Sequence, residues 1–349
     1  MVVSVAPAGS AEYHRDMSEG SFGVILPSNH IREAIPLAKL ADAESVDSLW
    51  TIETRLTGDA ITPLSVYAAN TARIRVGTAG IPIWTRHPAL IAQTFATLHA
   101  LAPGRVVLGL SAWWNPLATR VGLSLKKPVT AMREVIESIR LLLAAEGPVN
   151  YAGEFVRLRD VRLESRADDT HKIRIYIGAV GPQLLRLATR VADGIVLNGG
   201  HTVAVIRREV EVIRQEAIRV GRPFEEIEIL KMMRIRVDDD KERAVAGHKP
   251  DVARYIAEQA HIARSSEADP GLVTRLRSMM SWPSSESEAV RAADLIPDSL
   301  VESHGCYGDR QEVRSRLGEY MAAGITMPLL LPDNITYMRR ALDLMLEGW

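Results

Sequence analysis

Two glycine-rich turns are the residues of this sequence best suited to hold a ligand. A predicted strand, Ile173–Ala179, leads into the turn Gly178-Ala179-Val180-Gly181, and a second strand, Gly194–Leu197, ends at Leu197-Asn198-Gly199-Gly200. Neighbouring parallel strands end at one edge of a sheet, and a helix that starts there offers free N–H groups to an anion. We therefore predict a phosphate-binding site; the alternative is that both segments are ordinary turns.

The other predicted strand ends carry few ionisable groups. Our candidates for catalysis are Glu53, Asn29 and Thr54, although Glu53 could simply pair with Arg55 or with a neighbouring loop. Aromatic and amide side chains after the fourth strand are candidates for substrate contact: Trp113, Trp114 and Asn115. No cluster of metal ligands is evident. A bound redox cofactor would supply the chemistry that such a site lacks.

Eight strand-like segments separated by helical patterns have to position these residues. The strands are predicted at 22–26, 47–52, 74–81, 106–110, 173–179, 194–197, 227–237 and 326–331. This alternation, in a chain longer than about 250 residues, predicts a (β/α)8 TIM barrel, in which functional residues lie at the carboxyl ends of the strands. A doubly wound sheet is the alternative fold.

The sequence predicts a leader followed by one domain. We predict a flexible leader at 1–20 and a single barrel domain at 21–349, with insertions near 111–129, 149–163 and 248–298. The insertions follow strands 4 and 7. In the segment 149–163 apolar and polar residues alternate, which predicts a β-hairpin. Neither long insertion has enough apolar content, by this reading, to form a core of its own.

Composition excludes several kinds of partner. The 42 basic and 43 acidic residues give a net charge of -1, which favours neither nucleic acid nor an anionic membrane surface. No apolar run reaches the roughly 18 residues of a membrane span. Cys306 is the single cysteine, so no intrachain disulfide can form, and we expect a cytoplasmic protein.

Three segments resemble the bacterial-luciferase-like superfamily of barrel oxidoreductases. They are RIRVGTAGIPIWTRHPALIAQTFATLHALAPGRVVLGLSAWW at 73–114, IYIGAVGPQLLRLATRVADGIVL at 175–197 and GDRQEVRSRLGEYMAAGITMPLLLP at 308–332. Their spacing is most similar to the branch of methylene-tetrahydromethanopterin reductase and other enzymes that use the deazaflavin coenzyme F420. Members that use FMN share the same motifs.

The resemblance implies roles for particular residues. In F420-binding members the third strand ends in a bulge with a non-prolyl cis peptide behind the deazaflavin ring, and Ala79-Gly80, followed by Ile81, match it. Gly109 and Ser111 match backbone positions that line the cofactor pocket. The two glycine turns, 178–181 and 197–200, match segments that bind the phosphate and side chain of the cofactor. A homodimer is also implied.

Two departures from relatives narrow the function. Thr54 occupies a position where many relatives have histidine, so a histidine proton donor is not assigned. Asn29 and Trp114 stand where the sugar-phosphate dehydrogenase branch has glutamates, so that substrate is not assigned either. We predict an F420-dependent oxidoreductase, more specifically a reductase, that transfers a hydride between F420 and a small organic substrate. The alternatives are an FMN-dependent luciferase-like monooxygenase and a non-catalytic flavin- or deazaflavin-binding protein.

Overall fold

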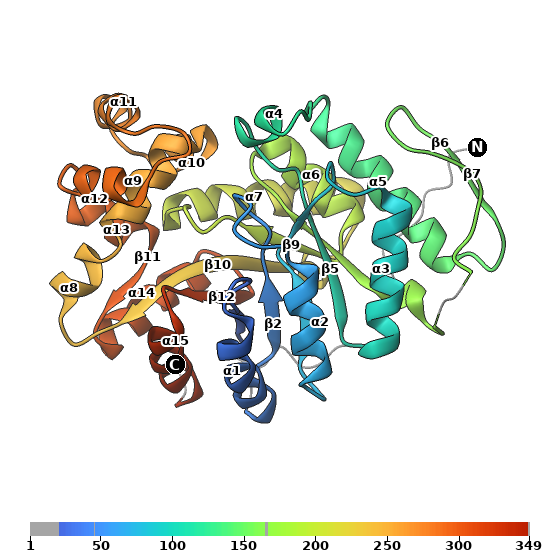
Figure 1. Cartoon of the computed structure of the whole chain (residues 1–349), viewed down its shortest axis with the longest axis horizontal. Helices are drawn as coiled ribbons and strands as arrows, with labels where there is room; N and C mark the ends of the chain where they lie inside the picture. Colours follow the sequence, from blue (N-terminus) through green and yellow to red (C-terminus); the bar gives the residue numbers. More distant parts are fainter. Residues whose placement is uncertain (1–20, 45, 165–166, 348–349) are drawn as a thin grey trace. The chain divides into compact units, whose positions relative to one another are not determined.

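The structure is a computed structural model that describes residues 21–44, 46–164 and 167–347. The predicted leader at 1–20 lies outside the described residues. The chain divides into two compact units (Figure 1). The first contains Met1–Val196 and Val212–Ile229, and the second contains Leu197–Glu211 and Leu230–Trp349.

Parallel strands that alternate with helices build the first unit. Its strands pair in the order β1-β2-β3-β5-β8-β9. Helix α2 packs against β2 and helix α3 packs against β5 (Figure 1). The bounds are β1 (Gly23–Ile25), α1 (Ile31–Ala43), β2 (Ser48–Thr51), α2 (Ile61–Ala69), β3 (Arg75–Thr78), β4 (Ile81–Pro82), α3 (Pro88–Leu101), β5 (Val106–Ser111), α4 (Leu117–Arg120), α5 (Pro128–Ala144), β6 (Val149–Ala152), β7 (Arg157–Val161), β8 (Arg174–Gly178), α6 (Pro182–Val191) and β9 (Gly194–Leu197).

Burial explains why these segments form strands. Ile175, Tyr176 and Ile177 in β8 are all fully buried, as expected for a parallel strand covered on both faces. The predicted third strand, 74–81, is interrupted and forms β3 and β4 instead of one strand. The predicted hairpin at 149–163 is confirmed by the antiparallel pair β6 and β7.

A long strand organises the second unit. Strand β10 (Glu228–Val237) pairs in parallel with β11 (Gly305–Gly308) and with β12 (Met327–Pro332). Helix α7 (Val203–Val220) contributes residues to both units. The remaining helices are α8 (Lys241–Ala246), α9 (Lys249–Glu258), α10 (Ala260–Ser265), α11 (Pro270–Met279), α12 (Glu286–Ala293), α13 (Asp298–His304), α14 (Arg310–Ala322) and α15 (Ile335–Leu346).

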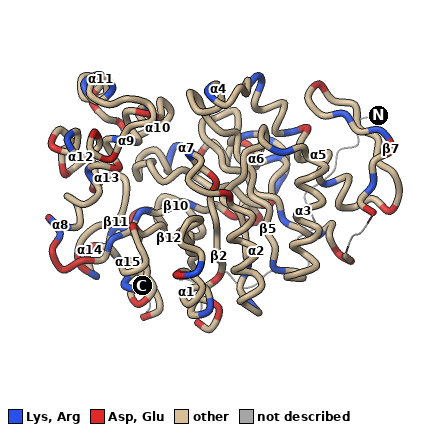
Figure 2. Tube along the Cα trace, in the orientation of Figure 1, with Lys and Arg blue, Asp and Glu red and all other residues tan. Residues whose placement is uncertain are grey.

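The insertion after β10 has an apolar core, and the expectation that it lacks one is wrong. Four of its core side chains are alanines. Alanines do not add to a count of large apolar residues, but they allow helices to pack closely. Basic and acidic residues lie close together along the helices around this core (Figure 2). The core contains Ala244, Val245, Val252, Ala253, Ile256, Leu272, Leu276, Met280, Ala289, Ala292, Ile296, Val301 and Tyr307.

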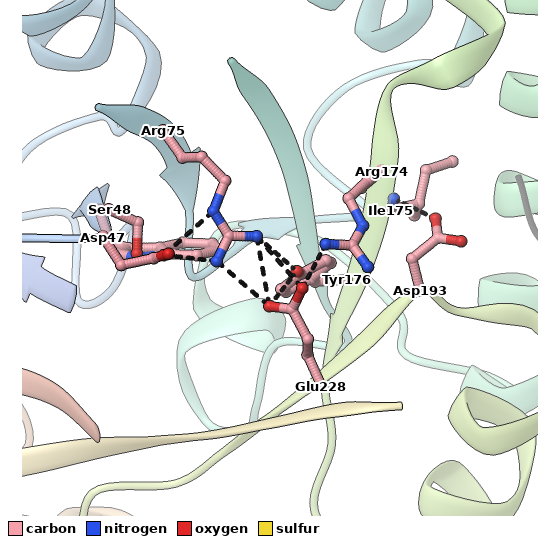
Figure 3. A network of polar contacts seen from close by, with 9 residues as sticks. Asp47, Ser48, Arg75, Arg174, Ile175, Tyr176, Asp193 and Glu228 are labelled. Atoms are coloured by element: carbon pink, nitrogen blue, oxygen red, sulfur yellow. Dashed lines mark hydrogen bonds and ion pairs between the residues drawn. The ribbon is translucent and has the colours of Figure 1, made fainter. Parts of the chain in front are cut away.

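A buried charge network ties together the amino ends of strands in the first unit (Figure 3). Arg75 at the start of β3 donates from Nε to Asp47 Oδ1 at 3.0 Å and from Nη1 to Glu228 Oε1 at 3.2 Å. Tyr176 donates to Glu228 Oε2 at 2.6 Å, and Arg174 pairs with the same carboxylate. The amino-terminal face of a barrel serves stability rather than chemistry. We assign this network a structural role.

Candidate functional site

The ends of β3 and β5 approach each other so closely that only glycine fits. A Cβ on Gly109 would lie 1.7 Å from the carbonyl oxygen of Thr78, and a Cβ on Gly80 would lie 2.6 Å from the carbonyl oxygen of Gly109. Thr78 Oγ1 donates to the Gly109 carbonyl at 2.9 Å and accepts from the Gly109 N–H at 3.0 Å. The peptide bond Ala79-Gly80 is cis, as the resemblance implies.

The residues beside this contact lie where the sequence predicted. Ile81 in β4 pairs with Leu110 in β5, and the Ser111 carbonyl accepts from the Ile83 N–H at 3.1 Å. Ser111 also pairs with Gly178 at the end of β8. The structure therefore brings Ala79, Gly80, Ile81, Gly109, Ser111 and Gly178 to one edge of the first unit's sheet.

The turn before α6 leaves the start of that helix without a side-chain cap among the described residues. Gly181 has φ +83°, a conformation that glycine adopts readily, and a Cβ there would meet nothing within 4 Å. Pro182 takes the first helical position, and no side chain of the described residues caps the helix. The Ala179 N–H donates to the Val196 carbonyl at 3.1 Å. The first N–H groups of a helix have no partner within the helix and can bind an anion.

The turn Leu197–Gly200 belongs to the second unit, and much of its hydrogen-bonding capacity is used internally. The Gly200 N–H donates to Asn198 Oδ1 at 2.8 Å, and the His201 N–H donates to the Asn198 carbonyl at 3.4 Å. Thr202 Oγ1 accepts from the Val205 N–H at 3.3 Å in the first turn of α7. Since these donors are occupied, this turn is less open to a phosphate than the turn before α6.

Two residues of the second unit that could titrate are buried. His201, directly after the turn, is fully buried with Nδ1 2.8 Å from Glu209 Oε2. Cys306 is buried in β11. Burial lowers the pKa of Lys231 to about 7. The Nζ of Lys231 bonds to the Met232 carbonyl at 3.1 Å and to the Gly199 carbonyl at 3.4 Å.

Glu53, after β2, is held by a partner that the sequence did not reveal. Arg86 Nη1 donates to Glu53 Oε1 at 2.9 Å, and the Ala60 N–H donates to Oε2 at 3.3 Å. The carboxylate is 13% exposed and the guanidinium 26%, so the pair is reachable from solvent. Arg55 and a neighbouring loop were the two expected sources of a partner, and the loop before α3 supplies one. Arg86 lies 33 residues away in the chain, and no local pattern indicates which residue of the loop makes the contact.

The other two candidates for catalysis lie on loops of the same unit. Asn29 follows β1 and is exposed, and its side chain makes no hydrogen bond to the described residues. Thr54 is half-buried, and its carbonyl accepts from the Thr57 N–H at 3.2 Å. Neither is tied to Glu53 by a hydrogen bond among the described residues.

The loop after β5 presents an unused donor. Trp113 has φ +58°, and its indole Nε1 is buried without a hydrogen-bond partner among the described residues. Trp114 is half-buried, and Asn115 is exposed with Oδ1 accepting from Thr119 Oγ1 at 3.0 Å. A buried N–H without a partner is costly in a folded protein. A ligand atom that accepts from Trp113 would satisfy it.

The described part of the chain has neither a metal cluster nor a membrane-spanning helix. It contains no group of three or more His, Cys, Asp or Glu side chains placed to hold a metal ion. None of its helices is long and apolar enough to cross a membrane.

Comparisons with known proteins cover nearly the whole chain. The 5,10-methylenetetrahydromethanopterin reductase of Methanolobus tindarius is 26% identical over 88% of this chain and 92% of its own. A putative coenzyme F420-dependent oxidoreductase of Mycobacterium tuberculosis is 29% identical over 92% of this chain and 95% of its own.

A solved structure confirms the predicted fold. The coenzyme F420-dependent tetrahydromethanopterin reductase from Methanopyrus kandleri matches with a TM-score of 0.83 at 24% identity, over 95% of this chain and 98% of that one. The fold is therefore the (β/α)8 barrel. The family described as luciferase-like monooxygenase matches residues 4–327. The chain accordingly belongs to the luciferase-like monooxygenase family of barrel enzymes.

Proposed function

We propose that this protein is an F420-dependent oxidoreductase that transfers a hydride between F420 and a small organic substrate. Relatives named for F420 match across most of the chain, which supports this choice of cofactor. The structural observation that carries the proposal is the open start of α6, where Gly181 leaves N–H groups without a side-chain cap. Bound F420 would supply the hydride acceptor or donor.

The protein's own residues would bind and orient the cofactor. In this proposal, the N–H groups at the start of α6 hold a phosphate, and the backbone of residues 79–81 with Gly109 and Ser111 lines the ring. The buried Trp113 indole fits an acceptor atom of a ligand. Glu53 and Arg86 form a polar pair at the carboxyl end of β2, where Glu53 could hold a proton. The substrate would lie against Trp113, Trp114 and Asn115.

Titration of the purified chain with F420 and with FMN tests the cofactor. We expect F420 to bind more tightly than FMN, with a change in F420 absorbance when a substrate is added. Tight FMN binding with oxygen consumption would instead establish the luciferase-like monooxygenase alternative, which the family's description favours. F420 binding without turnover of any substrate would support the alternative that the protein binds the cofactor but is not an enzyme.

A matched pair of variants tests the role of α6. Gly181→Ala places a Cβ on a residue with φ +83°, and Gly122→Ala does the same at φ +78° on an exposed turn, also in open space. Gly181 also has ψ +158°, a region that almost only glycine adopts, so Gly181→Ala carries a backbone strain of about 1–3 kcal/mol and the melting temperature of both variants is measured together with the affinity. We expect only Gly181→Ala to weaken F420 binding. Equal affinities in the two variants would remove the α6 turn from the site.

Assembly and location complete the proposal. The resemblance favours a homodimer in the cytoplasm. Light scattering after size-exclusion chromatography would measure the mass, for which a value near 38.4 kDa would exclude the dimer.

A further inference from the structure

Two arginines of the second unit point from the same face of β10. Arg234 and Arg236 are two residues apart, so their side chains leave the strand in the same direction. Both guanidinium groups are largely buried, with 13% and 11% of the side chain exposed. Arg234 pairs in register with Leu331 near the end of β12, and Asp333 follows that strand. Both arginines therefore lie at the carboxyl end of these strands.

Arg236 has a hydrogen-bond partner, an aromatic ring and two carboxylates around its guanidinium. Its Nη2 donates to Tyr337 Oη at 2.6 Å, and its guanidinium lies over the Tyr337 ring at 4.1 Å. Carboxylates flank it on two sides, with Asp333 at 3.6 Å and Asp238 at 3.7 Å. These contacts explain the position of Arg236 without any ligand.

Arg234 is positioned but not hydrogen-bonded. Its guanidinium lies over the Tyr255 ring at 4.6 Å, and Nη1 is 3.6 Å from Asp251 Oδ2, which is beyond hydrogen-bond distance. It makes no hydrogen bond to the described residues. Arg105, which is similarly buried, donates four hydrogen bonds. Arg234 thus keeps the N–H donors of a rigid, planar fork free.

Two neighbouring side chains also lack partners. The Tyr307 hydroxyl, on a residue only 4% exposed, has no hydrogen-bond partner in the described structure. Burial raises the pKa of Tyr307, so the group is a neutral donor. His248 is fully buried; its ring lies 4.5 Å from that of Tyr307, its Nδ1 is unpartnered, and its Nε2 is 2.5 Å from Asp333 Oδ1.

The Tyr307 hydroxyl lies close to Arg234. Gly305 pairs in register with Arg234, and a Cβ on Gly305 would lie 2.7 Å from both the Arg234 carbonyl oxygen and Tyr307 Oη. Arg234 and Tyr307 also act electrostatically on each other's pKa, which places the guanidinium and the hydroxyl in one neighbourhood. The buried Tyr307 hydroxyl is costly to leave unsatisfied, and a ligand that accepts from it and from the guanidinium would remove that cost.

We propose that Arg234 and Tyr307 form a binding site for the carboxylate of a small organic acid. The guanidinium fork matches a carboxylate in shape, and the hydroxyl adds a third donor. A monoanion is favoured over a dianion, because the carboxylates of Asp238, Asp251 and Asp333 already lie beside the two arginines and would repel a dianion twice as strongly as a monoanion. The site is built from second-unit residues and does not depend on the proposed cofactor.

Isothermal titration of the full chain without cofactor tests the site. The probes are butyrate, its neutral isostere butyramide, and inorganic phosphate. We expect butyrate to bind, butyramide to give no heat, and phosphate to bind more weakly than butyrate. Absence of butyrate binding would overturn the site, and tighter binding of phosphate would overturn its assignment to a carboxylate. Because F420 is absent, neither result bears on the proposed function.

Three variants locate the binding. Arg234→Lys keeps the charge but loses the planar fork, and we expect butyrate affinity to fall at least about tenfold. Tyr307→Phe removes only the hydroxyl and should weaken binding severalfold while leaving the fold intact. The control is Arg339→Lys on the exposed face of α15, which should bind butyrate like the wild type. Wild-type affinity in both Arg234→Lys and Tyr307→Phe would contradict the proposal.

Discussion

Replacing Lys231 by methionine should stabilise the protein in a pH-dependent way. Lys231 is fully buried on β10, with Nζ 4.5 Å from the centre of the Tyr320 ring and hydrogen bonds to two backbone carbonyls. Burial outweighs these contacts and lowers its pKa from an ordinary 10.5 to about 7. The native state therefore binds fewer protons than the unfolded chain between these two values.

The sign and size of the effect follow from proton linkage. Because the unfolded state binds more protons, wild-type stability rises with pH from about 7 to about 10.5. The margin of Lys231→Met is the amount by which its free energy of unfolding exceeds that of the wild type. Methionine does not titrate, so this margin is largest at pH 7 and below. Between pH 7 and pH 9 this margin should shrink by about 2 kcal/mol, at 1.36 kcal/mol per pKa unit.

Urea unfolding followed by circular dichroism at pH 7, 8 and 9 measures this margin. The control is Lys126→Met, which removes an exposed ammonium group and should give a margin that is constant with pH. The comparison with the wild type at each pH cancels the titration of all other groups. A margin for Lys231→Met that stays constant or grows from pH 7 to pH 9 would show that Lys231 is charged in the native state, and would refute the reasoning.

Four further variants test other contacts by urea unfolding or by melting temperature. Glu228→Gln should cost about 3–5 kcal/mol, because Arg75 loses a buried counter-charge, and a cost under about 1 kcal/mol would contradict the network. Arg75 and its neighbours hold the pKa of Glu228 below its ordinary value despite burial. The difference in free energy of unfolding between Glu228→Gln and the wild type should therefore shrink as pH falls below about 4.5. Gly109→Ala should prevent native folding, whereas Gly178→Ala, with its nearest contact at 3.5 Å, should melt near the wild type; equal melting temperatures would refute the steric argument. Asp309→Ala removes the acceptor for two N–H groups at the start of α14 and should cost about 1 kcal/mol, which an unchanged melting temperature would contradict.

Local patterns were sufficient to predict most of the elements. Strand β9 has the predicted bounds, Gly194–Leu197, because it is a short apolar run between an aspartate and an Asn-Gly turn. His87 directly precedes Pro88 at the start of α3, and its Nδ1 accepts from the Ala89 N–H at 3.2 Å as a helix cap. Such features depend on residues close together in the chain, which is why sequence alone reveals them.

Contacts between distant residues were the part that sequence could not supply. The pair of Glu53 with Arg86 joins residues 33 positions apart, and the pair of Arg75 with Glu228 joins residues 153 positions apart. Arg234 was visible as a strand-end residue, but its free donors become apparent only when Tyr255 and Asp251 are placed around it. A sequence shows which groups a site can use, whereas the fold decides which groups remain unsatisfied.

The glycines of the predicted cofactor site show that one residue type can be required for two different reasons. Gly109 and Gly181 were both assigned to a cofactor pocket through one resemblance. The structure requires Gly109 for packing, because a Cβ would overlap the Thr78 carbonyl whether or not a ligand is present. Gly181 has open space around it and a positive φ at the start of an uncapped helix, so packing alone does not explain it. Loss of function in a Gly109 variant would therefore say little about cofactor contact, whereas loss in a Gly181 variant that melts like Gly122→Ala would place the phosphate at α6.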